Sequence, residues 1–248
     1  MHRFSADIVS AVKIHINRLS AINSCDAKEI SKGIKSYRHF FPDIFESCYN
    51  KKGLWYHPLN KCCEWAHHLH KLRPLTYRSD LINKKISFDL SDAHERQKRL
   101  TEFAVKLADS EKSWPKKHYV VTLVTEYNQF LDLISENKNT VIVPSLRIDL
   151  VWHAHMHDHE KYMRDTEKIL GYPLDHNDDI SEKELEEHNQ NTERLWREKY
   201  GKRNNGLDDL LVIPAVVVLA TNSGGSSSGG CGSACSGGCG GGCGGGCG

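Results

Sequence analysis

The fold of this chain depends on two stretches, HLHKLRPLTYRSD at residues 68–80 and HAHMHDHEKYMRD at residues 153–165. In each stretch a histidine is followed by a second histidine after two residues, a tyrosine after seven more and an aspartate after another three. The matched residues are His68, His70, Tyr77 and Asp80 in the first copy, and His153, His155, Tyr162 and Asp165 in the second. Four matched positions of these types indicate an internal repeat, although two copies are too few for a solenoid.

The spacing within each histidine pair limits what the pair can bind. Residues two apart on a helix point about 200° away from each other, so both histidines of one copy cannot hold one ion. One histidine of each copy can instead face the interior, and a pseudo-twofold arrangement would bring these two into a shared centre. We expect His70 and His155 there, with His176 and Asp179 as further ligands, because histidine and carboxylate suit zinc or iron(II).

The second copy holds additional candidates for a motif or pocket. Asp149 lies four residues before His153 and therefore on the same helical face, and Trp152 directly precedes His153. The same residue types also fit a structural hydrogen-bond network between packed helices, or a pocket for a small ligand or peptide. The sequence leaves these three alternatives open, and it contains no His-Glu-x-x-His motif that would favour the metal site.

Hydrophobic periodicity predicts a mainly α protein with one multi-helix domain over residues 1–206. We expect seven to nine helices, with residues 120–124 as an alternative strand. The predicted helices cover residues 5–22, 26–37 with a break or restart at Pro42, 58–72, 92–108, 119–135, 146–157, 160–170 and 181–200. Their predicted start signals are Ser5, Asp26, Pro58, an Asp92–Glu95 capping box, Ser145 and a Ser181–Glu184 capping box, with Gly171 and Gly201 as stop signals.

The C-terminal part has a different composition. Residues 207–222 form an apolar connecting segment, and residues 223–248 are rich in glycine and cysteine, which predicts disorder. The five tail cysteines recur every four residues, at Cys231, Cys235, Cys239, Cys243 and Cys247. Their thiols could be acylated, bind soft metals such as Cu(I) or Zn(II), or crosslink under oxidation, and a flexible extension without such a role is the alternative.

Charge and hydropathy narrow the classes of partner. The chain has 33 basic and 32 acidic residues and a net charge of +1, which does not support binding to nucleic acid. Its longest apolar run, residues 210–220, is shorter than the roughly 20 residues of a transmembrane helix, and no secretory signal is evident. We therefore expect a cytoplasmic protein without a transmembrane helix, which associates with membranes only through acylation of the tail.

At the repeated stretches the chain resembles the glycine-rich domain-containing proteins of plants, which have relatives in fungi and other eukaryotes. The resemblance rests on WAHHLHKLRPLTYRSD at residues 65–80 and on VPSLRIDLVWHAH at residues 143–155, which continues through Tyr162 and Gly171 to LDHND at residues 174–178. It extends over roughly residues 5–200 and implies a shared helical domain without an established activity. Family members usually have Leu and Pro where this chain has His157 and His159.

Two functions follow as predictions. The first is an interaction or scaffold protein with a protein partner, in which the repeated motif is structural and the tail is an effector. The alternative is a metal-binding protein for zinc or iron, which could also be an enzyme. No nucleophile–base pair, phosphate-binding loop or dinucleotide fingerprint is evident in the sequence, and this disfavours an enzyme.

Overall fold

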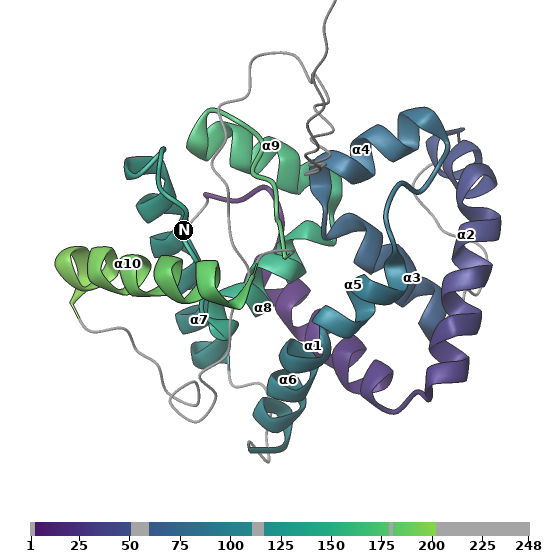
Figure 1. The fold of residues 1–248 in the computed structure, drawn as a ribbon, viewed down its shortest axis with the longest axis horizontal. Coiled ribbons are helices and arrows are strands. Elements are labelled where there is room, and N and C mark those ends of the chain that lie inside the picture. Colours follow the sequence, from purple (N-terminus) through teal and green to yellow (C-terminus); the bar gives the residue numbers. More distant parts are fainter. Residues whose placement is uncertain (1–2, 51–59, 111–116, 179–180, 202–248) are drawn as a thin grey trace, which may run out of the picture.

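A computed structural model describes residues 3–50, 60–110, 117–178 and 181–201 of the chain (Figure 1). The described residues form helices and no β-strand, so the prediction of a mainly α fold is confirmed, and residues 120–124 are helical. The helices are α1 (Ile8–Asn23), α2 (Ala27–Asn50), α3 (Lys61–Lys71), α4 (Pro74–Asn83), α5 (Leu90–Arg96), α6 (Lys98–Ser110), α7 (Lys117–Glu136), α8 (Leu146–Met156), α9 (His159–Leu170) and α10 (Glu182–Tyr200).

Helices α1 and α8 lie in the middle of the molecule and pack against each other. Helices α2 to α5 lie on one side of this pair, and α7, α9 and α10 lie on the other (Figure 1). Every residue of α8 is buried, and α8 also contacts α6, α7 and α9. A helix that is buried on all sides must satisfy its polar side chains inside the protein.

Arg147 illustrates how α8 meets this requirement. Its guanidinium donates two hydrogen bonds of 2.8 Å to the carboxylate of Glu126 on α7, and a third of 2.9 Å to the hydroxyl of Tyr119. A bidentate pair with further hydrogen bonds can compensate for the desolvation of both charges. The pair therefore fixes how α8 is rotated against α7.

Several predicted helix boundaries are confirmed. The side chain of Ser145 caps α8, Ser181 and Glu184 form a reciprocal capping box at the start of α10, and Gly171 ends α9 with a φ of 86°. Gly201 also has a positive φ, of 80°, at the end of α10. Glycine adopts this left-handed region without the steric cost that other residues have.

Three predicted boundaries were wrong. Helix α1 is capped by Asp7, because the cap must directly precede the first helical residue, and the backbone N–H of Ser5 instead donates to Asp165. Helix α2 continues through Pro42, where a break was predicted. The capping box at Asp92 does not form, because Asp89 caps α5.

The helix predicted over residues 92–108 is divided into α5 and α6 at Gln97. Gln97 is buried, and its carbonyl accepts a hydrogen bond of 2.9 Å from the hydroxyl of Thr101. Helix α3 begins after Asn60, whose side chain caps it, and Pro58 lies outside the described residues. The described part of the chain thus has more helices than predicted.

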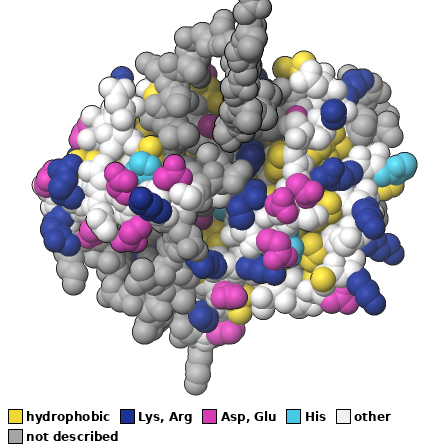
Figure 2. Space-filling model, in the orientation of Figure 1, with side chains coloured by type: hydrophobic (Ala, Val, Ile, Leu, Met, Phe, Trp, Pro, Cys, Tyr) yellow, Lys and Arg dark blue, Asp and Glu magenta, His cyan; other side chains and the backbone are white. Residues whose placement is uncertain are grey.

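The surface has mixed charge. Over the face shown in Figure 2, Lys and Arg side chains lie among Asp and Glu side chains. None of the helices in the described ranges is both long enough and apolar enough to cross a membrane. The apolar segment 207–222, the glycine-rich segment 223–248 and the five tail cysteines lie outside the described residues.

Candidate metal centre

The two copies of the motif form two similar helical hairpins, α3–α4 and α8–α9. In each hairpin the histidine pair lies near the end of the first helix, and the tyrosine and aspartate lie in the second helix. Pro74 opens α4, where a missing N–H costs nothing, so the chain turns within two residues of α3. The second hairpin turns at His157 and Asp158, and Asp158 caps α9.

The second histidine of the first copy, His70, lies in a buried hydrogen-bond network. Its Nε2 donates to Oδ2 of Asp80 at 2.9 Å, and its Nδ1 accepts from the hydroxyl of Tyr37 at 2.9 Å. The same Asp80 oxygen accepts from the backbone N–H of Ser87 at 2.8 Å. Burial lowers the pKa of His70 to about 4, although Asp80 acts in the opposite direction, so the ring is neutral at pH 7.

The second histidine of the other copy, His155, has the same set of partners. Its Nε2 donates to Oδ2 of Asp165 at 3.2 Å, its Nδ1 accepts from the hydroxyl of Tyr127 at 3.1 Å, and Asp165 accepts from the N–H of Ser5 at 2.8 Å. Burial also lowers the pKa of His155. The His70 and His155 networks therefore occupy both ring nitrogens of each histidine in hydrogen bonds and leave none for a metal ion.

The repeated tyrosines have different roles in the two copies. The hydroxyl of Tyr162 accepts from Nε1 of Trp152 and donates to the carbonyl of Leu174, both at 2.8 Å. The hydroxyl of Tyr77 is hydrogen-bonded to Nε2 of His67 at 3.0 Å. The Tyr162 hydroxyl thus anchors the loop after α9, which carries His176.

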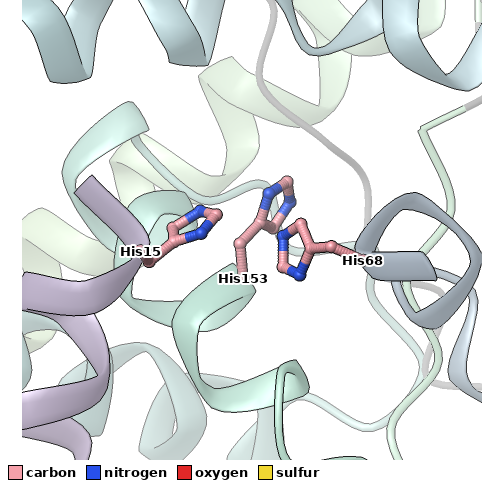
Figure 3. A group of neighbouring side chains, drawn as sticks. All are labelled: His15, His68 and His153. Atoms are coloured by element: carbon pink, nitrogen blue, oxygen red, sulfur yellow. The ribbon is translucent and has the colours of Figure 1, made fainter. Parts of the chain in front are cut away.

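The first histidines of the two copies, His68 and His153, meet near His15 of α1 in the centre of the protein (Figure 3). All three side chains are at most 1% exposed, and their nearest ring nitrogens lie within 4.8 Å of one another. Both ring nitrogens of His15 and of His68, and Nδ1 of His153, have no hydrogen-bond partner among the described residues. Buried polar atoms without a partner are rare and require an explanation.

A second group of potential ligands shares His153. Its Nε2 lies 2.9 Å from Nε2 of His176 and 3.2 Å from Oδ1 of Asp149, and the latter two atoms are 3.7 Å apart. Asp149 lies one helical turn before His153 on α8, whereas His176 comes from the loop after α9 and packs against Trp152. We call these five residues, His15, His68, Asp149, His153 and His176, the central cluster.

Burial and local charge set the protonation of the central cluster. Burial lowers the pKa of His15 and of His68 well below the usual range, and the guanidinium of Arg18 adds to this effect. Burial alone would raise the pKa of Asp149, but the favourable interactions with His153 and His176 outweigh it, so the pKa lies below its ordinary value. An ionised carboxylate and neutral imidazoles are the forms that bind zinc or iron(II).

The predicted metal ligands do not lie together in the structure. Of the four predicted metal ligands, His176 lies in the central cluster, His70 and His155 lie in their own networks, and Asp179 lies outside the described residues. His15 was not predicted as a site residue, because it belongs to neither copy of the motif and lies on the apolar stripe of α1.

His157 and His159 lie where the two hairpins approach each other. Nε2 of His159 donates to the carbonyl of Pro74 at 3.0 Å, and the guanidinium nitrogens of Arg18 lie 3.3 Å from the ring nitrogens of His157. Both residues are part of a contact between hairpins and neither belongs to the central cluster.

The repeated motif is similar to a known protein family. Residues 68–165 match the family model "Glycine-rich domain-containing protein-like". Similar proteins from Arabidopsis thaliana are glycine-rich domain-containing protein 2, which is 25% identical over 80% of this chain and 33% of its own length, and glycine-rich domain-containing protein 1, which is 24% identical over 80% and 32%. The chain thus spans about a third of the length of these curated relatives. No solved structure matches the chain. The family model begins and ends on residues of the repeated motif, so the resemblance to the glycine-rich domain-containing proteins is confirmed at this motif.

Proposed function

We propose that the helical domain binds a divalent transition-metal ion, zinc or iron(II), through Asp149, His153 and His176. The observation that carries this proposal is the spacing of the three ligand atoms, at 2.9, 3.2 and 3.7 Å. In a tetrahedral zinc site with bonds of about 2.0–2.1 Å, neighbouring ligand atoms lie about 3.3 Å apart. The three atoms are therefore already arranged as one face of such a site.

The charge of the site supports the same proposal. Asp149 is 3% exposed, and its only ion-pair neighbours among the described residues are the imidazoles of His153 and His176. Asp149 is ionised beside these imidazoles, which is the form that binds a metal, and a divalent cation would add a full positive charge to the buried site. Two histidines and one carboxylate form a ligand set used by both zinc and non-haem iron(II), and leave further coordination positions open.

The interaction or scaffold role stays a prediction from the sequence, as do the protein partner and the cytoplasmic location. A metal ion in the central cluster is compatible with that role, because it would join α8 to the loop that follows α9.

Metal analysis of the full chain tests the proposal. The five tail cysteines are replaced by serine in every variant, so that their thiolates do not compete for the metal. A chelator first removes any bound metal, and one equivalent of Zn²⁺, or of Fe²⁺ in the absence of oxygen, is then added. We expect the metal to stay bound to the protein during gel filtration. Asp149→Asn and His176→Ala should each weaken the affinity at least tenfold.

The matched control is His39→Ala, which removes an exposed histidine of α2 and should leave the affinity unchanged. Circular dichroism of each variant checks that the helices are retained. If the parent chain holds no more metal than Asp149→Asn while both are folded, the proposal is wrong.

A further inference from the structure

The central cluster contains more ligand atoms than one ion needs. His15 and His68 contribute four ring nitrogens, and none of them has a hydrogen-bond partner among the described residues. Nδ1 of His153 also has no hydrogen-bond partner among the described residues, although Nε2 of this ring faces Asp149 and His176. Five unpartnered nitrogens on three neighbouring rings are not explained by the ion at Asp149, His153 and His176.

The three rings come from three different helices and converge. The ring centroids of His15 and His68 are 4.7 Å apart, and those of His153 lie 6.1 Å from His15 and 6.3 Å from His68 (Figure 3). Their ligand atoms lie within 4.8 Å of one another, which is wider than the roughly 3.3 Å of a tetrahedral site. Binding of an ion at this position therefore requires the three rings to move closer together.

The two nitrogens of an imidazole ring point in different directions, so one ring can bind two ions. We propose that the central cluster takes two metal ions, the second held by His15, His68 and Nδ1 of His153, with the His153 ring as the bridge. This inference rests on the proposed function, because Nε2 of the same ring is a ligand of the first ion. The bridging ring loses its remaining N–H proton to solvent and becomes an imidazolate, and no electron is transferred.

The second position differs chemically from the first. It offers imidazole nitrogens and no carboxylate, a ligand set that suits zinc or copper. Arg18 lies one helical turn after His15, and its positive charge acts on both His15 and His68. We therefore expect the second ion to bind more weakly than the first, with the negative charge of the bridging imidazolate partly offsetting this repulsion.

Native mass spectrometry counts the ions on each chain directly. We expect the full chain with the tail cysteines replaced by serine to take up two Zn²⁺ in sequence. His15→Gln should hold one Zn²⁺, whereas His153→Ala, which removes the shared ligand, should hold none. His39→Ala should still hold two.

The outcomes separate this inference from the proposed function. A parent chain that holds one Zn²⁺, and holds it equally well with His15→Gln, would overturn the two-ion inference and leave the first site intact. A chain that holds none would overturn both. Because His15→Gln is expected to keep one ion, that ion also reports that the variant is folded.

The bridge has a spectroscopic signature of its own. In a chain loaded with two Cu²⁺, a shared imidazolate couples the two electron spins and weakens the electron paramagnetic resonance signal. Two uncoupled Cu²⁺ signals per chain would mean that His153 does not connect the ions and would overturn the bridging role.

Discussion

The two copies of the motif are similar at the level of single residues, because His70 and His155 each have a tyrosine and an aspartate as hydrogen-bond partners. Asp80→Asn removes the negative charge. The amide keeps one oxygen that can accept from His70 and Ser87, but a buried NH2 group replaces the other carboxylate oxygen. An unsatisfied buried group costs about 1–3 kcal/mol, so we expect the free energy of unfolding to fall by about that amount. Urea denaturation measures it.

The control for this substitution is Asp109→Asn, at an exposed position near the end of α6. Surface substitutions usually change stability by less than about 0.5 kcal/mol. If Asp80→Asn and Asp109→Asn have the same effect, Asp80 does not stabilise the fold through His70.

The sequence correctly predicts that the two histidines of each pair point in different directions. A spacing of two residues implies that the histidines of each pair diverge, and in the structure His68 and His153 face the centre while His70 and His155 turn away. The sequence predicted His70 and His155 in the centre, but the structure holds these two elsewhere through the hydroxyls of Tyr37 and Tyr127. Neither tyrosine lies within the repeated motif.

At the level of the helices, α2 and α3 approach each other closely at Gly33. A Cβ atom at this position would lie 2.4 Å from Cβ of Cys62 and 2.5 Å from its backbone carbon. Gly33→Ala gains up to about 1 kcal/mol in helix propensity, but the contact with the backbone of α3 forces the two helices apart. We expect a net loss of stability of about 1–3 kcal/mol, measured by urea denaturation.

Lys35→Ala is the matched control, since it introduces alanine at an exposed position two residues further along α2. It should leave stability almost unchanged. A Gly33→Ala variant as stable as the parent chain would contradict the close approach of these helices.

Element boundaries were predictable where local side chains decide them. Ser145, Ser181 with Glu184, and Gly171 act within one turn of their helices, and their roles were confirmed. The division between α5 and α6 has no glycine or proline to mark it. Gln97 is buried there and its amide lies 3.5 Å from Asp178, so a distant contact that periodicity does not reveal accompanies the break.

For the molecule as a whole, α1 connects the two halves of the repeat. It contacts both α3 and α8, and its His15 lies beside the first histidine of each copy. The described residues therefore form a core in which polar rings, rather than apolar side chains alone, lie at the point where the hairpins meet. Such a core depends on these rings remaining neutral or binding a cation.

Acidification should consequently destabilise the whole fold. Burial lowers the pKa of many histidines across the core, namely His15, His67, His68, His70, His155 and His157. In the unfolded chain an imidazole has a pKa of about 6.5, whereas that of folded His70 is about 4. Between these values the unfolded chain binds more protons, so the free energy of unfolding decreases as the pH falls from 7 to 4.

His70 alone should account for a loss of about 1 kcal/mol at pH 5.5 relative to pH 7, and the other buried histidines add to it. Urea denaturation at a series of pH values, with a chelator present to remove bound metal, measures the effect. His70→Gln should reduce the slope of stability against pH, whereas His39→Ala, at an exposed position, should not. A urea midpoint that stays constant between pH 7 and pH 5 would mean that the buried imidazoles titrate as they do in the unfolded chain, and that the core does not hold them in the neutral form.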